Sequence, residues 1–189
     1  MLTAELVSKF LTRLDEGFAR FRVRPETADG EPVTALELHQ DQWAVTFGGE
    51  KGEARQPLIT CSTEQDACLA FLACIADLEA RWKGHNPVEQ IRPWSKTELT
   101  VQKVGCIFRL CGWTERLPFQ RVEPTRFGDL VFATQYDCAN RSRSIRIGLN
   151  RSIWRAEEEV DARLVVIAEH ASEHGACSAA VARMLEGQC

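Results

Sequence analysis

Apolar and polar positions in the first third of the chain predict one helix followed by strands. Apolar side chains recur every three to four residues over 2–20, the spacing of an amphipathic helix. Two alternating segments, 34–38 and 43–47, predict a β-hairpin that turns near Gln40 and Asp41. The apolar segment 58–61 then predicts a third strand.

A second helix is predicted directly after these strands. Ser62 and Gln65 have the spacing of a capping box, in which each side chain satisfies a free backbone donor. Gly84 and Pro87 predict that the helix ends near Lys83. Its inward face would hold Cys68, Phe71, Leu72, Ile75, Leu78 and Trp82.

The second half begins after a segment rich in turn-forming residues, 85–93, which predicts a boundary. Ser95 and Glu98 repeat the capping-box spacing and predict a helix that ends at Gly112. Alternation over 130–136 and 145–149 predicts a second hairpin, joined by residues 137–141.

Two further helices are predicted after this hairpin. Ser152 would cap the first, with Glu157, Glu158 and Glu159 in its first turn at the positive end of the helix dipole. This helix would end at Gly175, and residues 176–186 would form the last one. We therefore predict an α+β protein of two helix/β-hairpin/helix units packed together, over residues 1–84 and 95–189.

Composition is that of an ordinary globular chain. Of the 189 residues, 44% are hydrophobic and 26% are charged, which argues against a disordered chain. The longest apolar run, 69–76, is far shorter than the roughly 20 residues of a membrane-spanning helix. Residues 1–14 lack the apolar core of a signal peptide, so we expect a cytoplasmic protein with reduced cysteines and no membrane partner.

The net charge of -4 conceals a basic middle segment. Residues 1–100 carry 11 basic and 16 acidic side chains, residues 101–155 carry 10 and 4, and residues 156–189 carry 2 and 7. Nearly all the basic residues of segment 101–155 are arginines, which pair well with carboxylates and phosphates. These arginines could bind a partner protein, bind nucleic acid, or pair with the chain's own acids.

The sequence contains no complete catalytic or cofactor motif. His170 to His174 matches H-x-x-E-H, but this zinc-hydrolase motif takes a further acidic ligand from well downstream, whereas the chain ends fifteen residues later and Gly175 should break the helix. A structural zinc site is left open, with the ligands His170, His174, Cys177 and Cys189. Cys138 lies near arginines but lacks the glycines and arginine of a cysteine-phosphatase loop, so we predict no catalytic residue, no metal and no cofactor.

One segment resembles part of a known protein class. Trp43-Ala44-Val45, the turn Glu50-Lys51-Gly52-Glu53 and the helix start 63–72 follow one another as in bacterial polymorphic-toxin immunity proteins. The similarity covers about residues 42–83. It implies a cytoplasmic inhibitor that binds one cognate toxin and occludes its active site.

These observations predict a binding protein. The immunity-type inhibitor is the first hypothesis, and a nucleic-acid-binding accessory protein that uses segment 101–155 is the alternative. The predicted contact residues are Trp43, Glu50, Trp113, Arg116, Arg121 and Arg126.

Overall fold

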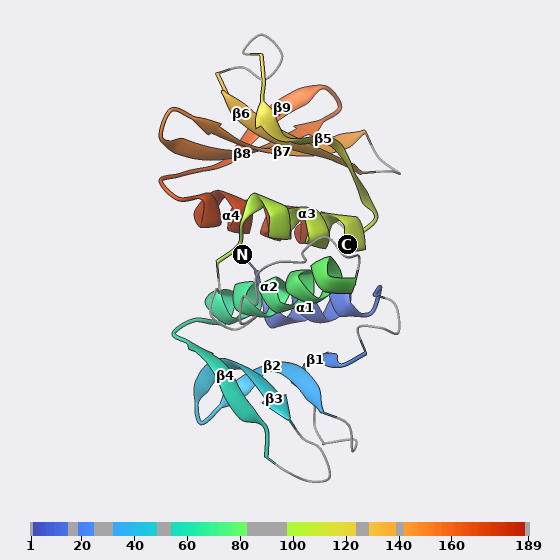
Figure 1. Cartoon of the computed structure of the whole chain (residues 1–189), viewed down its shortest axis with the longest axis vertical. Helices are drawn as coiled ribbons and strands as arrows, with labels where there is room; N and C mark the ends of the chain where they lie inside the picture. Colours follow the sequence, from blue (N-terminus) through green and yellow to red (C-terminus); the bar gives the residue numbers. More distant parts are fainter. Residues whose placement is uncertain are drawn as a thin grey trace. The chain divides into compact units, whose positions relative to one another are not determined.

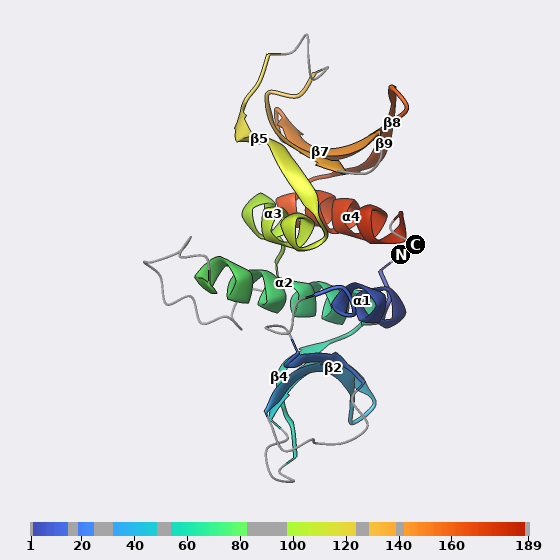
Figure 2. The same ribbon diagram turned by 90° about the vertical axis from the view of Figure 1, so that its right-hand side faces the viewer.

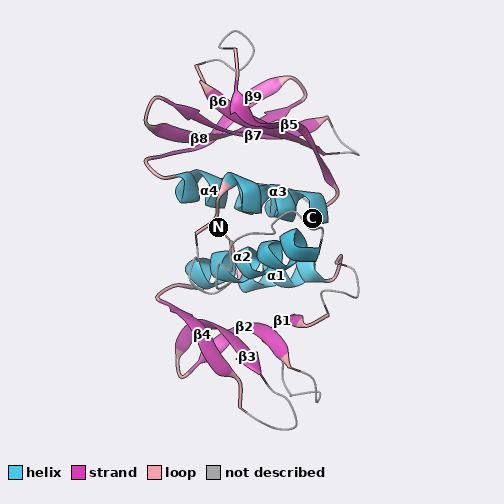
Figure 3. Cartoon of the chain, in the orientation of Figure 1, coloured by secondary structure: helices cyan, strands magenta, loops and turns pink. Residues whose placement is uncertain are grey.

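The computed structural model describes residues 2–14, 19–24, 32–48, 54–82, 98–123, 129–138 and 142–187, with only the backbone for 77–82. The chain divides into two compact units, Met1–Glu98 and Leu99–Cys189. Each unit contains helices and one mostly or wholly antiparallel sheet, which confirms the α+β class (Figures 1 and 3). The predicted boundary at 85–93 lies outside the described residues.

The first unit is a four-stranded sheet with two helices. Its elements are α1 (Ala4–Leu11), β1 (Phe21–Val23), β2 (Val33–His39), β3 (Gln42–Gly48), β4 (Gln56–Cys61) and α2 (Glu64–Trp82). Strand order is β1-β2-β3-β4, in which β1 runs parallel to β2 and the other pairs are antiparallel. The predicted hairpin is confirmed, because Gln40 and Asp41 form its turn with positive φ angles of 49° and 65°.

The first helix is shorter than predicted. It ends at Leu11, where the Thr12 hydroxyl donates back to the Lys9 carbonyl at 2.8 Å. Phe21 already belongs to β1 and packs edge-on against Phe71 of α2, with ring centroids 5.6 Å apart. The helix predicted over 2–20 is therefore too long, because the observed helix covers only Ala4–Leu11.

Helix α2 begins close to its predicted start, although another side chain caps it. The Thr63 hydroxyl accepts from the Asp66 backbone N–H at 3.1 Å, in place of the predicted Ser62 and Gln65 pair. The predicted inward residues whose side chains are described are all buried: Cys68, Phe71, Leu72 and Ile75.

The second unit is a five-stranded antiparallel sheet between two helices in sequence. Its elements are α3 (Val101–Leu110), β5 (Trp113–Arg121), β6 (Phe132–Cys138), β7 (Arg143–Asn150), β8 (Ile153–Val160), β9 (Arg163–His170) and α4 (Glu173–Glu186). Strand order follows chain order, β5-β6-β7-β8-β9. The β6–β7 hairpin is the one predicted. The sheet also contains three further strands, β5, β8 and β9.

The helix predicted from Ser152 to Gly175 is wrong. Residues 153–170 form the β8–β9 hairpin, which turns at Asp161 and Ala162 with positive φ angles of 49° and 63°. Gly175 does not end a helix either, because it lies in the first turn of α4, where its N–H donates to the Ser172 hydroxyl at 3.2 Å. The description of each unit as a helix, one hairpin and a helix is corrected accordingly.

In each unit the helices cover the convex face of a curved sheet, and the concave face points away from them (Figure 2). The core of the second unit lies between α3, α4 and this convex face. Phe108 of α3 contacts both Trp113 and Tyr136, with centroids 5.2 and 4.7 Å apart. Because burial removes the phenol from water, the pKa of Tyr136 is raised.

Candidate protein-binding surface

The H-x-x-E-H string has a structural role in this fold. His170 ends β9 and His174 lies in α4, so the two imidazoles do not share one helix. His174 Nδ1 accepts from the Leu99 N–H at 2.9 Å, and Glu173 Oε1 accepts from the Val101 N–H at 2.7 Å. Both contacts satisfy backbone N–H groups at the start of α3, where a helix has no carbonyl of its own to accept from them.

The described part of the chain contains no group of three or more His, Cys, Asp or Glu side chains placed to hold a metal ion. Cys189, one ligand of the zinc set left open by the sequence, lies outside that part. His170 Nδ1 is 2.9 Å from the Ser172 hydroxyl.

Cysteines of the described segments are free thiols, and the deeper ones are poor nucleophiles. Burial raises the pKa of Cys68 to about 12 and also raises the pKa of Cys177. Cys138 is only partly buried and lines a shallow pocket on the second sheet, discussed below.

Most described arginines of segment 101–155 bind carboxylates of their own unit. The pairs are Arg109–Glu115, Arg116–Asp137, Arg143–Glu158, Arg146–Glu159, Arg155–Asp129 and Arg155–Glu169. Pairing with the chain's own acids was one of three predicted roles of these arginines, together with binding of a partner protein and binding of nucleic acid. Arg121 and Arg151 are the exceptions, because neither forms an ion pair with any residue that the structure describes.

Two contact residues were predicted in the first unit, Trp43 and Glu50, and Trp43 is half-buried. Trp43 lies on β3, where the Arg24 guanidinium sits 4.9 Å from its ring centroid. This contact covers part of the indole. Glu50 lies outside the described residues.

The predicted contact residues of the second unit are spread along β5. Trp113 is only 3% exposed and packs against Phe108 and Arg143, so it offers little surface to a partner. Arg116 is exposed and paired with Asp137 at 3.3 Å. Arg121 is exposed at the far end of the strand, and Arg126 lies outside the described residues.

Three stacked aromatic side chains lie near Arg121, and we call Phe119, Phe132 and Trp154 the aromatic ridge. Phe119 and Phe132 are exposed, whereas Trp154 is half-buried. The Phe119 ring stacks on Phe132 with centroids 6.1 Å apart and on Trp154 with centroids 5.6 Å apart. Phe119 and Phe132 are 40% and 39% exposed. Three large rings at the surface of one sheet are therefore held in a fixed arrangement.

Cross-strand register explains why the ridge forms. Arg121 pairs with Phe132, Phe132 with Leu149, and Leu149 with Trp154, so one row crosses four strands. Directly paired residues of antiparallel strands point to the same face. Phe132 and Trp154 share the face of Tyr136 but lie nearer the other end of their strands, where Phe132 is exposed and Trp154 is half-buried. Of this row, only Arg121 was predicted as a contact residue. Trp154 fell within the helix wrongly predicted over 152–175.

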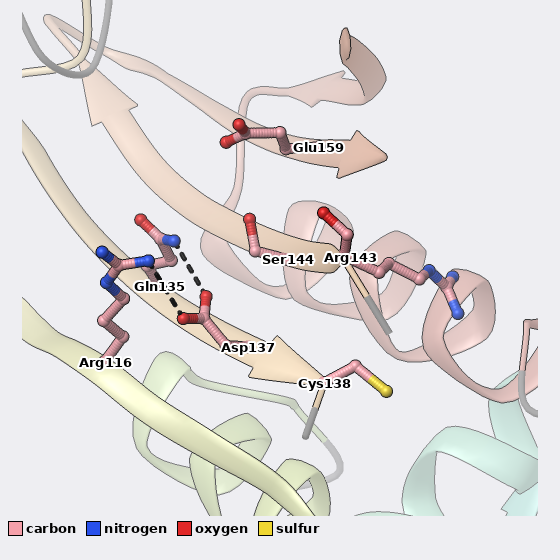
Figure 4. A pocket seen from close by; sticks show the side chains of 8 residues that line it. Arg116, Gln135, Asp137, Cys138, Arg143, Ser144 and Glu159 are labelled. Atoms are coloured by element: carbon pink, nitrogen blue, oxygen red, sulfur yellow. Dashed lines mark hydrogen bonds and ion pairs between the residues drawn. The ribbon is translucent and has the colours of Figure 1, made fainter. Parts of the chain in front are cut away.

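A shallow pocket of about 230 Å³ lies on the same unit and includes Arg116 (Figure 4). Asp137 accepts from Arg116 and from the Gln135 amide, at 3.3 and 2.9 Å. The Arg143 side chain points away from these groups, toward Glu158 and α4 (Figure 4). Arg116, Gln135 and Asp137 already bind one another, and Glu159 binds Arg146, so we do not assign the pocket a ligand.

Comparisons of this chain with family models, curated proteins and solved structures find no match. Among the described residues, no helix has both the length and the apolar character needed to cross a membrane.

Proposed function

We propose that this chain is a protein-binding inhibitor of the immunity type, which neutralises a cognate bacterial toxin by covering its active site in the cytoplasm. The observation that carries the proposal is the aromatic ridge beside Arg121, which forms no ion pair with any residue that the structure describes. Aromatic and arginine side chains supply much of the binding energy at protein interfaces. The resemblance of residues 42–83 to immunity proteins supports the same class.

The ridge also indicates the chemistry of the partner surface. Phe119, Phe132 and Trp154 present apolar area, and an apolar hollow on the toxin would exclude water from them. The Arg121 guanidinium next to them has no carboxylate partner in the described chain. We therefore expect the hollow to be flanked by Asp or Glu side chains, which form paired hydrogen bonds with a guanidinium.

The arginine pairs argue against the nucleic-acid alternative. Each phosphate contact contributes about 0.9 to the slope of log affinity against log salt concentration. Since Arg109, Arg116, Arg143, Arg146 and Arg155 are neutralised internally, only Arg121 and Arg151 are free among the described arginines of the basic segment. Two free arginines among the described residues would by themselves bind a polyanion weakly.

The test is a binding measurement with the toxin encoded next to this chain, by calorimetry, on wild type and Phe119→Asp. Loss of a central aromatic contact costs about 2–4 kcal/mol, so we expect the dissociation constant to rise by roughly 30-fold to 1,000-fold. Leu38→Asp is the matched control, because Leu38 is 56% exposed on the other sheet and should bind as wild type. Equal affinity of Phe119→Asp and wild type would remove the ridge from the interface. Tight, salt-sensitive binding of single-stranded nucleic acid by wild type would instead favour the alternative.

A further inference from the structure

The last helix of each unit begins with the same short pattern of residues. Segments 63–73 and 172–182 align without a gap and are identical at five of their eleven positions. The identical pairs are Glu64 and Glu173, Ala67 and Ala176, Cys68 and Cys177, Ala70 and Ala179, and Ala73 and Ala182. Both cysteines are buried, and burial raises the pKa of each thiol. The repeated residues therefore also share their surroundings.

Each of these segments begins with the same type of helix cap. The Thr63 hydroxyl accepts from the N–H three residues later at 3.1 Å, and the Ser172 hydroxyl does the same at 3.2 Å. The first helices agree as well, because α1 and α3 are each capped by a threonine that follows a buried leucine. These residues are Leu2 and Thr3 in the first unit and Leu99 and Thr100 in the second.

A repeated glutamate joins the two helix starts within each unit. Glu64 Oε1 accepts from the Ala4 N–H of α1 at 2.8 Å. Glu173 Oε1 accepts from the Val101 N–H of α3 at 2.7 Å. Both donors are the first N–H of their helix, which water or a nearby side chain can satisfy, so neither helix needs a glutamate 60 or 72 residues away. The same long-range contact in both units is an independent point of agreement.

One hairpin in each sheet has the same turn length and the same paired residues. Leu38 pairs with Trp43 in the β2–β3 hairpin, and residues 40–41 form the turn. Leu149 pairs with Trp154 in the β7–β8 hairpin, and residues 151–152 form the turn. A leucine and a tryptophan therefore face each other across a two-residue turn in both units.

The strand that follows each hairpin is bulged at the same place. Trp43 pairs with Cys61 and Trp154 pairs with His170, and both partners stand two residues before the helix cap. The register then shifts between the second and the third residue after each tryptophan. A bulge is a local irregularity that an antiparallel pair does not require. Its repeated position is therefore a further point of agreement.

These features recur in the same order along the chain: the threonine-capped first helix, the hairpin, the bulge, and the last helix with its glutamate contact. Similar helices often carry similar caps, since few residue types cap a helix well. The glutamate contact, the bulge position and the identities within 63–73 have no such common cause. We propose that the chain is an internal duplication, in which α1 and β2-β3-β4-α2 form one copy and α3 and β7-β8-β9-α4 form the other.

The two copies differ in the strands beside this shared part, and most of the aromatic ridge lies there. Strand β1 runs parallel to β2, whereas β6 runs antiparallel to β7 and pairs in turn with β5, so β5 and β6 have no counterparts among the described strands. Phe119 and Phe132 come from these two strands, and Trp154 alone has a counterpart, Trp43. Trp43 contacts the Arg24 guanidinium at 4.9 Å, whereas Trp154 stacks on Phe119 at 5.6 Å. The toxin-binding surface therefore belongs to the second copy alone, a step that rests on the proposed function.

The first experiment measures amide hydrogen exchange of the full chain by NMR. Glu64→Ala should speed exchange of the Ala4 amide by roughly tenfold and leave the Val101 amide unchanged, because one hydrogen bond is lost in one unit only. Glu173→Ala should do the reverse. Glu5→Ala, which removes an exposed acid of α1, should change neither rate.

The two glutamates must behave alike if the units are copies. Acceleration in one unit without the matching acceleration in the other would overturn the duplication. Glu64→Gln and Glu173→Gln cover the case in which an alanine variant fails to fold, because they keep a neutral acceptor. They should give smaller accelerations of equal size in the two units, and unequal ones would contradict the proposal.

Affinity for the proposed cognate toxin tests whether the second copy alone binds. Trp154→Ala should raise the dissociation constant by roughly 30-fold or more, while Trp43→Ala at the equivalent position should bind as wild type. Phe119→Asp replaces Trp154→Ala where the latter fails to fold. Equal weakening by Trp43→Ala would show that both copies bind and would overturn this step. If wild type does not bind the toxin, the proposed function fails, and the exchange rates still decide the duplication.

Discussion

Replacing Glu158 with Gln should destabilise the second unit strongly, because this carboxylate neutralises two arginines. Glu158 is 2% exposed on β8, and it accepts from Arg143 and, at 2.7 Å, from Arg183 of α4. Arg143 is itself buried, with 8% of its side chain exposed, so it cannot regain water when its partner is lost. Removing one partner of a buried pair costs about 3–5 kcal/mol.

The contacts that remain place the expected value near the lower end of this range. Arg143 keeps its hydrogen bond to the Arg183 carbonyl at 2.9 Å and its position 5.4 Å from the Trp113 ring centroid. Arg183 is 48% exposed and can be solvated. We therefore expect Glu158→Gln to lower the free energy of unfolding of this unit by about 3 kcal/mol at pH 7.

Urea denaturation followed by tryptophan fluorescence measures this change, with Glu159→Gln as the control. Glu159 is the next residue on the opposite face, and its pair with Arg146 is more exposed, so its loss should cost about 1 kcal/mol or less. If the two variants lose the same stability, the argument that burial decides the cost is refuted.

Acid should remove the difference between wild type and Glu158→Gln. Burial raises the pKa of Glu158, but the hydrogen bonds and charges of Arg183 and Arg143 outweigh it, so the pKa is lowered overall. A lowered folded-state pKa contributes stability above the unfolded value of about 4.3, and this contribution is lost as the pH falls below it. The gap between the two proteins should therefore narrow between neutral pH and the acid range, and a constant gap would contradict the assignment.

Three further predictions follow from contacts in the same unit. Gly148→Ala should destabilise the β6–β7 hairpin by more than about 2 kcal/mol, since a Cβ there would lie 2.7 Å from the Phe132 carbonyl oxygen; thermal unfolding checks it, and an unchanged melting temperature would contradict it. His174→Ala should cost about 1 kcal/mol and speed amide exchange at Leu99, whereas unchanged exchange would show that the imidazole cap is unimportant. A thiol reagent at neutral pH should leave Cys68 and Cys177 unmodified in the folded chain, as mass spectrometry of digested protein can show; modification of both before unfolding would refute their burial.

Local patterns predicted those elements whose turns and caps are encoded nearby. The β2–β3 hairpin was predicted correctly because alternation on both sides leads to a polar pair, Gln40 and Asp41, and Asp tolerates positive φ. Helix α2 was predicted because an apolar helical period follows a capping residue. In both cases the decisive interactions join residues close in the sequence.

The β8–β9 hairpin was missed because distant residues stabilise it. Three consecutive glutamates resemble the first turn of a helix, yet in the strand Glu158 turns to Arg143 and Arg183 while Glu159 turns to Arg146. Those arginines come from β7 and α4, and no local pattern announces them. The run of branched residues after Arg163 was a strand signal that the helical interpretation of the segment passed over.

The candidate site was predicted only in part for the same reason. Arg121 was identified from composition, but its neighbours Phe132 and Trp154 reach it through cross-strand register, which depends on the whole sheet. Trp113, chosen as an aromatic next to arginines, is in the core because Phe108 packs against it. Sequence composition therefore indicated the segment but could not separate its buried rings from its exposed ones.

Stoichiometry of inhibition tests the central claim most directly, namely that the chain acts by occupying a partner. The proposed cognate toxin is held at a fixed concentration well above the dissociation constant and titrated with this chain, and residual toxin activity is measured after equilibration. Occlusion predicts a linear decrease that reaches zero at one chain per toxin and does not change with incubation time. Complete loss of toxin activity at a small fraction of one equivalent, progressing with time, would show turnover and contradict the account.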